Sequence, residues 1–342
     1  MLRLFGTLAT VLFAIAAAVL TWPSFFRLER TFPVAQVISF RGVLVLAFIA
    51  VVVVALMLAM WRPLRGFAFS IALVAAIAVI ANVSVLVSRG LGADTLPTAT
   101  ATSVRVMTWN VSGDATPAEE VAKTAIAMDA DIIALPEMAN SVGESVAVAM
   151  REMGRPMWVH HVQYNSEIQN GPQAWETTIL ISPDMGDYSV IESSRDGSSN
   201  TNVMPSAVAM PVDGDGPTVV AVHAVAPRPA YMSSWRDDLQ WLADQCAEAN
   251  VIMAGDFNAT VDHMGGLGVD GATLGRCDDA AIATGNGAVG TWTSSLPALA
   301  GAPIDHVLHS GHWRPTGSVV LRSMDRSGSD HRPLIVQLEP NG

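Results

Sequence analysis

An aspartate and an asparagine stand two residues apart in the stretch G-D-F-N, where Asp256 and Asn258 follow the apolar run Val251 to Met253. A carboxylate can accept a proton or hold a cation, and an amide can donate a hydrogen bond to an anionic oxygen. Strand alternation would place Asp256 and Asn258 on one face and Phe257 on the other. Glycine, aspartate and asparagine are also ordinary turn residues, so this stretch becomes a candidate site only if it has partners elsewhere.

Polar side chains recur in the same way at the ends of other predicted strands. The segments are W-N-V with Asn110, L-P-E with Glu137, V-V-A-V-H-A with His223, I-D-H-V with Asp305 and His306, and S-D-H-R-P with Asp330 and His331. Strand ends at one edge of a sheet converge in space, so these side chains are expected to line a single pocket. One histidine or one Asp-His doublet would carry little weight, whereas six such segments favour a site.

The elements that must position these residues follow position 104, where short apolar runs alternate with helical stretches. Helices are predicted over 117–130, with Thr116 as the cap and Pro117 at the first position, and over 231–249. Strands are predicted at 104–111, 131–138, 177–182, 203–210, 217–223, 251–257, 304–309, 317–322 and 333–338. Many strands without strict strand–helix alternation indicate an α/β fold in which two packed sheets are flanked by helices.

Hydrophobic residues make up 51% of the 342-residue chain and are concentrated at its start. Three uncharged apolar stretches cover about 4–22, 42–60 and 67–87, each close to the roughly 20 residues that cross a bilayer as a helix. The predicted organisation is a transmembrane anchor at 1–88, a small, polar linker at 89–103 and one domain at 104–342. The first stretch could instead be a cleaved signal peptide.

Charge separates the same two regions. Residues 1–103 hold seven of the 19 basic and two of the 31 acidic side chains, so 104–342 hold 12 and 29, a net of −17 with His neutral. Nucleic-acid binders usually carry clustered Lys and Arg, and this domain has a single lysine, Lys123, so tight binding to duplex DNA is not expected. The short turn W-R-P-L-R-G suits the cytoplasm, which puts the domain outside it in a multi-pass membrane protein. Cys246 and Cys277 could then form a disulfide, or could be two unrelated buried thiols.

In their order along the chain, W-N-V, L-P-E, H-A-V-A-P, G-D-F-N-A, I-D-H-V and S-D-H-R-P resemble the endonuclease/exonuclease/phosphatase superfamily, here in a membrane-anchored bacterial form. DNase I, exonuclease III-type repair nucleases, bacterial sphingomyelinases and inositol polyphosphate phosphatases belong to this superfamily. The resemblance covers about 104–338, and G-D-F-N and S-D-H are its most specific elements. It implies a four-layer αββα sandwich and a hydrolase of phosphate esters that uses Mg²⁺ or Mn²⁺.

The resemblance also implies a role for each residue. His331 and Asp305 would form the acid/base pair, and Asp256 would orient or deprotonate the attacking water. Glu137 would bind the metal, with Asp330 as a second carboxylate. Asn110 would position the ion or the phosphate, and Asn258 and His223 would contact phosphate oxygens.

Some positions depart from the family pattern or stay open. Pro136 stands where many members have Gln, and no counterpart of the active-site Tyr of repair endonucleases is found. Glu176 is a candidate partner for His223, and His306 is expected to point into the structure. The substrate could be nucleic acid, a lipid head group or a small phosphodiester, and no protein partner is predicted. The alternative is a non-catalytic binding or scaffold module of the same fold at the membrane.

Overall fold

The computed structural model of the chain describes residues 2–113, 115–164, 171–191, 200–201 and 204–341. The chain divides into two compact units, Met1–Ser88 and Arg89–Gly342.

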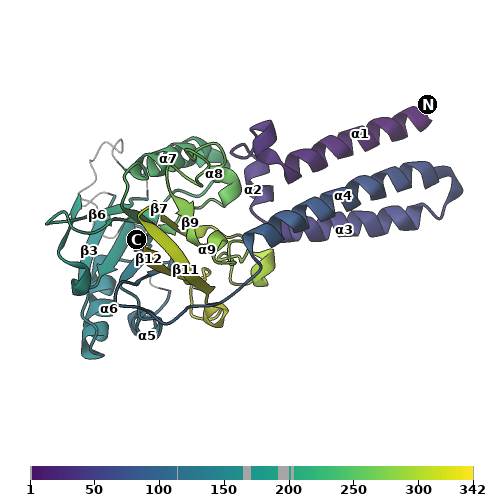
Figure 1. Ribbon diagram of the computed structural model, residues 1–342. Coiled ribbons are helices and arrows are strands. Elements are labelled where there is room, and N and C mark those ends of the chain that lie inside the picture. The colour runs from purple at the N-terminus through teal and green to yellow at the C-terminus, as the bar shows by residue number, and fades with distance from the viewer. Residues whose placement is uncertain (1, 114, 165–170, 192–199, 202–203, 342) are drawn as a thin grey trace. The chain divides into compact units, whose positions relative to one another are not determined.

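The first unit is helical (Figure 1). Its long helices are α1 (Leu2–Thr21), α3 (Arg41–Leu58) and α4 (Arg65–Arg89), with the short α2 (Val34–Ile38) between the first two. Three segments, Leu4–Thr21, Arg41–Leu58 and Arg62–Arg89, are helical, long and apolar enough to cross a membrane. They coincide with the three apolar stretches of the sequence.

Polar side chains join these helices to one another. The amide of Asn82 accepts a hydrogen bond from Arg41 Nη1 at 2.6 Å and donates one to Thr21 Oγ1 at 3.1 Å, and all three residues are buried. Hydrogen bonds of this kind hold helices together where no hydrophobic driving force acts between them.

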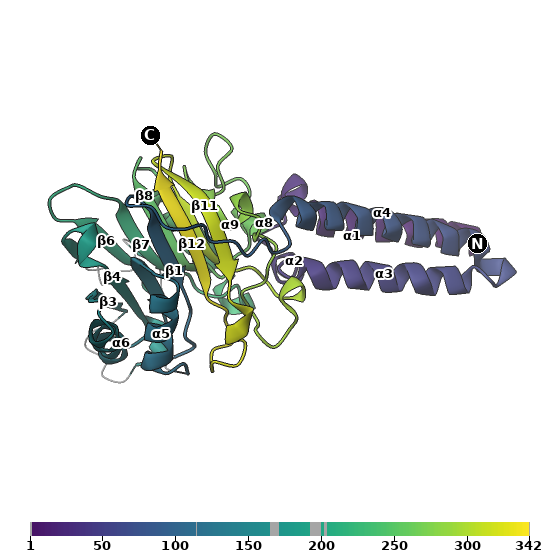
Figure 2. The same ribbon diagram turned by 60° about the horizontal axis from the view of Figure 1, so that its bottom comes forward.

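The second unit contains two six-stranded mixed sheets (Figure 2). The first sheet has the strand order β11-β12-β1-β2-β4-β3, and the second has the order β5-β6-β7-β8-β10-β9. The strands are β1 (Val104–Thr108), β2 (Ile132–Pro136), β3 (Trp158–Gln163), β4 (Glu176–Ile181), β5 (Tyr188–Ile191), β6 (Ala207–Pro211), β7 (Thr218–His223), β8 (Val251–Asp256), β9 (Asp278–Asp279), β10 (Asp305–His309), β11 (Trp313–Val320) and β12 (Leu334–Pro340).

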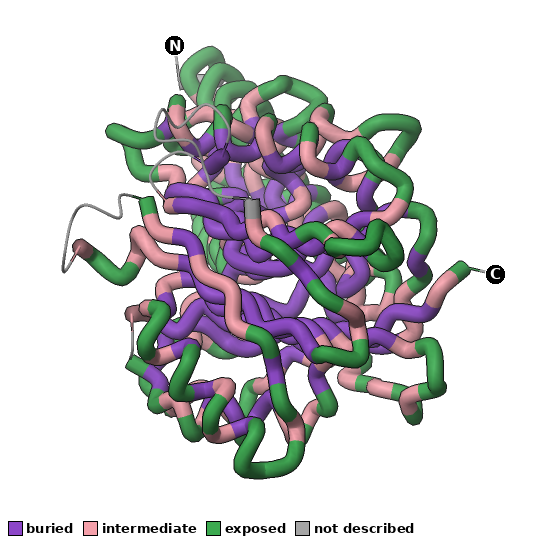
Figure 3. The backbone as a smooth tube through the Cα atoms, turned by 90° about the vertical axis from the view of Figure 1, so that its left-hand side faces the viewer, coloured by how far each residue is buried: buried purple, intermediate pink, exposed green. Residues whose placement is uncertain are grey.

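Alternate residues of the strands fill the space between the two sheets. Val106 and Ile132 of the first sheet pack in one buried cluster with Ala221 and Ile252 of the second. The opposite face of the first sheet packs against α5 (Ala118–Ala127) and α6 (Asn140–Glu152). On the side of the second sheet lies α7 (Met232–Gln245), with α8 (Val261–Met264) close by (Figure 1). Helix α9 (Ala280–Ala283) packs against β10 and β11, and its Ala280 and Ala281 belong to the cluster between the sheets. Figure 3 shows buried residues at the centre of the tube and exposed ones around it. The predicted α/β sandwich of two sheets with flanking helices is confirmed.

Local differences from the prediction have local causes. Helix α6 and strands β3 and β5 were not predicted. Strand β3 is partly exposed along most of its length, so its residues do not alternate clearly. Helix α5 begins at Ala118 with Pro117 as its N-cap, so Thr116 is not the cap. Of the strand predicted at 203–210, β6 occupies Ala207–Pro211, and residue 203 lies outside the described residues.

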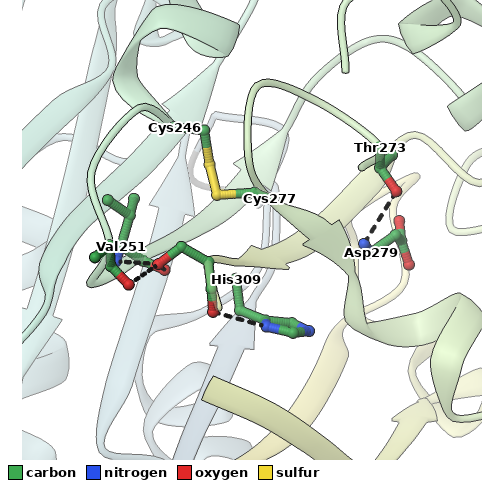
Figure 4. The surroundings of a disulfide bond; sticks show 8 residues. Cys246, Val251, Thr273, Cys277, Asp279 and His309 are labelled. Carbon is green, nitrogen blue, oxygen red and sulfur yellow. Dashed lines mark hydrogen bonds between the residues drawn. A yellow bond between two sulfur atoms is a disulfide. The ribbon is translucent and has the colours of Figure 1, made fainter. Parts of the chain in front are cut away.

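The two cysteines form a disulfide that ties the end of α7 to the segment before β9 (Figure 4). Cys246 and Cys277 are both fully buried, and their Cα atoms are 5.7 Å apart. Of the two alternatives for these residues, the structure contains the bonded pair.

Residues 89–103, expected to be a linker, make contacts within the second unit along their length. The guanidinium of Arg89 donates two hydrogen bonds to Asp262, at 2.6 and 2.8 Å. The backbone nitrogen of Gly92 donates to the carbonyl of Gly285, and Thr100 donates to Glu339 on β12. Both side-chain and backbone groups of this segment therefore make hydrogen bonds within the second unit.

A glycine-to-alanine pair tests how closely this segment packs. A methyl group at Gly90 would lie 2.1 Å from the carbonyl carbon of Gly285, whereas one at Gly154 would meet no described atom within 4 Å. Both glycines have a similar positive φ, of 90° and 88°, so both substitutions carry the same kind of backbone strain. We expect Gly90→Ala to lower the free energy of unfolding by at least about 2 kcal/mol more than Gly154→Ala. Urea unfolding of the full chain in detergent, followed by tryptophan fluorescence, measures the difference, and equal losses would contradict the close packing.

Candidate active site

The G-D-F-N stretch ends β8 and turns sharply after it. Asp256 is the last residue of the strand, and Asn258 has a positive φ of 46°, a conformation that asparagine adopts more readily than most residues. Asp256 Oδ1 accepts a hydrogen bond from the backbone nitrogen of Asn258 at 2.8 Å. The side-chain amide of Asn258 donates to the carbonyl of Ala224 at 2.9 Å and to Asp256 Oδ2 at 3.3 Å. The two residues are thus brought together by a turn, and not by strand alternation as the sequence suggested.

The neighbouring strand adds an aspartate–histidine pair. Strand β10 runs antiparallel to β8 with Asp305 opposite Asp256. His331, just before β12, places Nδ1 2.8 Å from Asp305 Oδ2 and Nε2 3.8 Å from Asp256 Oδ2. All three side chains are buried. His331 therefore lies between two carboxylates and can exchange a proton on either side of its ring.

The first sheet contributes Asn110 and Glu137, which follow β1 and β2. The side-chain nitrogen of Asn110 donates to Glu137 Oε1 at 3.1 Å and to Asp256 Oδ2 at 3.0 Å. One amide thus joins carboxylates that come from the two different sheets. Glu137 has a positive φ of 61°, which few glutamates adopt and which calls for support from the surrounding structure.

His223, at the end of β7, is fully buried and lies beside Glu137. Its Nε2 is 3.7 Å from Glu137 Oε1, and within the described part of the chain neither ring nitrogen makes a hydrogen bond. Its expected partner, Glu176, instead lies 3.3 Å from His161 Nε2 on the adjacent strand β3. A buried histidine with two unsatisfied nitrogens is a candidate for binding a ligand.

Asp330 is the most exposed of the predicted site residues. Its carboxylate accepts hydrogen bonds from Ser112 Oγ and from the indole nitrogen of Trp292, the latter at 2.8 Å. Neither Ser112 nor Trp292 was predicted, because a serine after W-N-V and a tryptophan in a loop have no distinctive spacing. His306, as expected, points into the structure, where its ring lies between Asp279 and the carbonyl of Ala259.

The buried charges shift the pKa values of the site. Burial lowers the pKa of His331, but the charge and hydrogen bond of Asp305, with the charges of Asp256 and Asp330, outweigh it and raise that pKa to about 10. Burial and then the neighbouring Asp305 raise the pKa of Asp256 to about 7. Burial and the charge of His331 lower the pKa of His223 to about 3, so this ring is neutral. At neutral pH the site therefore contains a protonated His331 next to an aspartate that readily takes up a proton.

The donor set fits a hard divalent cation. Asp256, Asp305 and His331 have ligand atoms within 4.8 Å of one another and could hold a metal ion, and Asp305 Oδ1 has no partner among the described residues. Glu137 adds a further carboxylate, joined to Asp256 through Asn110. These three carboxylates face only one imidazolium, so the cluster has excess negative charge, and its oxygen atoms are the ligands that Mg²⁺ and Mn²⁺ prefer.

Carboxylates and a histidine at the strand ends of a two-sheet sandwich are suited to the hydrolysis of phosphate esters. Residues 107–331 match the model of the Endonuclease/Exonuclease/phosphatase family. The chain therefore belongs to this family, whose members include nucleases and phosphatases.

Solved structures with low sequence identity share the fold. An endonuclease/exonuclease/phosphatase from Beutenbergia cavernae DSM 12333 matches with a TM-score of 0.52 at 17% identity, over 70% of this chain and 72% of that chain. A family protein from Leptotrichia buccalis C-1013-b matches with a TM-score of 0.52 at 14% identity, over 69% and 99%. A humanized D. rerio TDP2 with 14 mutations matches with a TM-score of 0.51 at 14% identity, over 70% and 100%. No curated protein matches the chain.

The raised pKa of Asp256 predicts an unusual dependence of stability on pH. Because the folded-state pKa lies above the unfolded value of about 3.9, Asp256 stabilises the metal-free fold at low pH and loses that contribution as the pH rises through about 7. We expect Asp256→Asn to increase the free energy of unfolding at pH 8 by roughly 1–3 kcal/mol, with little effect at pH 4. Urea unfolding in EDTA at the two pH values measures this effect.

Asp330 supplies a control of opposite sign. Burial raises its pKa, but the hydrogen bonds from Ser112 and Trp292 and the charge of His331 lower it overall, so its charged form stabilises the fold above the unfolded pKa. Asp330→Asn should therefore lower stability at pH 8. A loss of stability from both substitutions would contradict the charge repulsion assigned to Asp256.

Proposed function

We propose that this chain is a membrane-anchored, divalent-metal-dependent phosphoesterase that hydrolyses phosphodiester bonds, with its catalytic unit outside the cytoplasm. The observation that carries the proposal is the position of Asp256. Its carboxylate lies 3.8 Å from the ring of His331 and is joined to Glu137 by the amide of Asn110. An acid/base pair and a metal-binding carboxylate are thus in contact with one residue.

Glu137 is the proposed metal ligand, with Asp330 as a second carboxylate and Asn110 as the residue that positions the ion or the phosphate. Mg²⁺ is the proposed ion, with Mn²⁺ as a substitute, because the donors are oxygen atoms. Bound there, the ion would neutralise phosphate charge and the charge that develops on the leaving oxygen.

The residues of the chain have complementary proton states. Asp256 would orient the attacking water and take its proton, which its raised pKa favours at neutral pH. His331, protonated and held through Nδ1 by Asp305, would give a proton to the leaving oxygen from Nε2. The carboxylate of Asp305 fixes the ring orientation, as in other aspartate–histidine pairs of hydrolases.

Asn258 and His223 are the proposed contacts to the non-bridging phosphate oxygens. His223 is neutral and buried, so its one ring N–H is available to donate. The amide of Asn258 donates to Ala224 at 2.9 Å and to Asp256 at the longer distance of 3.3 Å. We expect the hydrogen bond from Asn258 to Asp256 to be replaced by a hydrogen bond to a phosphate oxygen when substrate binds.

The substrate follows from charge and from the helices of the first unit. A domain with a net charge of −17 and one lysine does not favour duplex DNA, which is bound through many Lys and Arg contacts. Three helices that are long and apolar enough to cross a membrane favour a substrate at or near the membrane surface. A lipid head group or a small phosphodiester fits these observations better than duplex DNA.

Hydrolysis by the full chain in detergent tests the proposal. Bis-p-nitrophenyl phosphate, p-nitrophenyl phosphate, sphingomyelin and plasmid DNA are compared with Mg²⁺, with Mn²⁺ and with EDTA. We expect metal-dependent cleavage of a phosphodiester, and a loss of roughly 10²–10⁴-fold in kcat for His331→Ala, because a general acid is removed.

His312→Ala is the matched control, because this exposed histidine follows β10 at the opposite end of that strand from Asp305 and should leave the rate unchanged. A folded chain that binds metal but cleaves none of these substrates would favour the non-catalytic scaffold. Equal cleavage without His331 would contradict its role as the general acid.

A further inference from the structure

Glu137 has an unfavourable backbone conformation, and two hydrogen bonds to strand β4 hold the backbone there. The residue has a positive φ of 61° and follows directly after β2, where the chain leaves the sheet. The backbone nitrogen of Glu137 donates to the carbonyl of Glu176 at 3.0 Å. The carbonyl of the next residue, Met138, accepts a hydrogen bond from the hydroxyl of Thr178 at 2.8 Å. Both partners lie on β4, on either side of Thr177, and so bracket the strained residue from the adjacent strand.

The hydroxyl of Thr178 is fixed by its surroundings. The side chain is fully buried, and a methyl group added to Gly143 of α6 would lie 2.5 Å from its Cγ2, so helix and threonine are in close contact. Thr178 Oγ1 also lies 3.0 Å from Nδ1 of His161 on β3. Because Thr178 gives its single proton to Met138, it accepts from His161, which requires the ring proton on Nδ1.

Glu176 supports the conformation of Glu137 through its backbone carbonyl, and not through an ion pair with His161. The carboxylate lies 3.3 Å from His161 Nε2, which would favour a charged ring, but burial lowers the pKa of His161 to about 4. The side-chain hydrogen bond from β4 to the backbone of this turn is therefore the one that the hydroxyl of Thr178 donates to Met138.

Thr177 provides an internal comparison. It is adjacent to Thr178 and equally buried, but among the described residues its hydroxyl has no hydrogen-bond partner. Valine has nearly the same shape as threonine, so replacing Thr177 by valine should remove no hydrogen bond to a described residue. The hydroxyl of Thr178, in contrast, binds the backbone next to Glu137, the proposed metal ligand.

We propose that Thr178, supported by His161, is a positioning residue that holds Glu137 in its left-handed conformation and thereby sets the affinity of the site for its divalent cation. The inference rests on the proposed role of Glu137 as a metal ligand. Groups that orient metal ligands commonly contribute 10- to 100-fold to metal affinity, and the hydroxyl of Thr178 binds the carbonyl of the residue that follows the ligand.

Calorimetric titration of the metal-free full chain in detergent with Mn²⁺ measures the effect without relying on activity. We expect Thr178→Val to weaken Mn²⁺ binding by roughly 10-fold, because the shape is kept and the hydrogen bond to Met138 is lost. Thr177→Val, one residue away and equally buried, should leave the affinity unchanged. Glu137→Gln serves as the reference for loss of the ligand itself.

A second pair decides the question if the valine variant does not fold. Thr178→Ser and Thr178→Ala lose the same methyl group, and only the alanine variant loses the hydroxyl. Serine should therefore keep most of the affinity that alanine loses. A purely structural role would instead lower the unfolding midpoint of both variants and leave the Mn²⁺ affinity of the folded protein alone.

The outcomes separate the two proposals. If Glu137→Gln weakens Mn²⁺ binding and no Thr178 variant does, Thr178 does not position the ligand, and the proposed function stands. If the unsubstituted protein binds no Mn²⁺, or Glu137→Gln binds it equally well, the metal assignment in the proposed function is wrong and the role of Thr178 falls with it.

Discussion

The amide of Asn110 is the interaction on which the geometry of the candidate site depends. Its nitrogen donates to Glu137 of the first sheet and to Asp256 of the second, at 3.1 and 3.0 Å. Without a donor between them, two carboxylates so close together would repel one another and push the ends of the sheets apart. The apolar core keeps the sheets face to face along their length, and this one side chain joins them at the candidate site.

That arrangement places function in conflict with stability. Asp256 and Asp305 occupy facing positions on β8 and β10, and both are nearly inaccessible to solvent. One protonated ring, that of His331, lies against both of them and opposes their charge. Buried carboxylates with a single counter-charge cost stability, and they are kept where a cation or a reacting proton completes the balance. The raised pKa of Asp256 shows this cost, because burial and the charge of Asp305 disfavour its ionised form.

How far the sequence predicts this site depends on the type of signal each residue gives. Asp256, Asp305 and His331 were predictable because they stand at the ends of apolar strands within short distinctive motifs. Thr178 and His161 were not, because a threonine inside a buried strand and a histidine inside a partly exposed one have no spacing that sets them apart. Their hydrogen bonds join β3, β4 and the turn after β2, and sequence periodicity does not report such contacts. The two-sheet fold itself was predictable, because apolar alternation shows which segments are buried strands and how many there are. The same alternation does not show which side chains share a hydrogen bond.

The doublet Asp305-His306 illustrates why adjacency in sequence misleads about pairing. Neighbouring strand residues point to opposite faces, so Asp305 meets His331 from another segment, and His306 meets Asp279. The ring of His306 faces a carboxylate at 2.6 Å and the carbonyl of Ala259 at 2.8 Å, two acceptors, so both of its nitrogens must carry protons and both are committed to the fold. His331 has the same kind of aspartate partner at Nδ1, but its Nε2 stands 3.8 Å from Asp256 and makes no such commitment to a backbone group. The structural pair Asp279–His306 and the proposed catalytic pair Asp305–His331 therefore differ in what the second ring nitrogen contacts, which no doublet in the sequence can reveal.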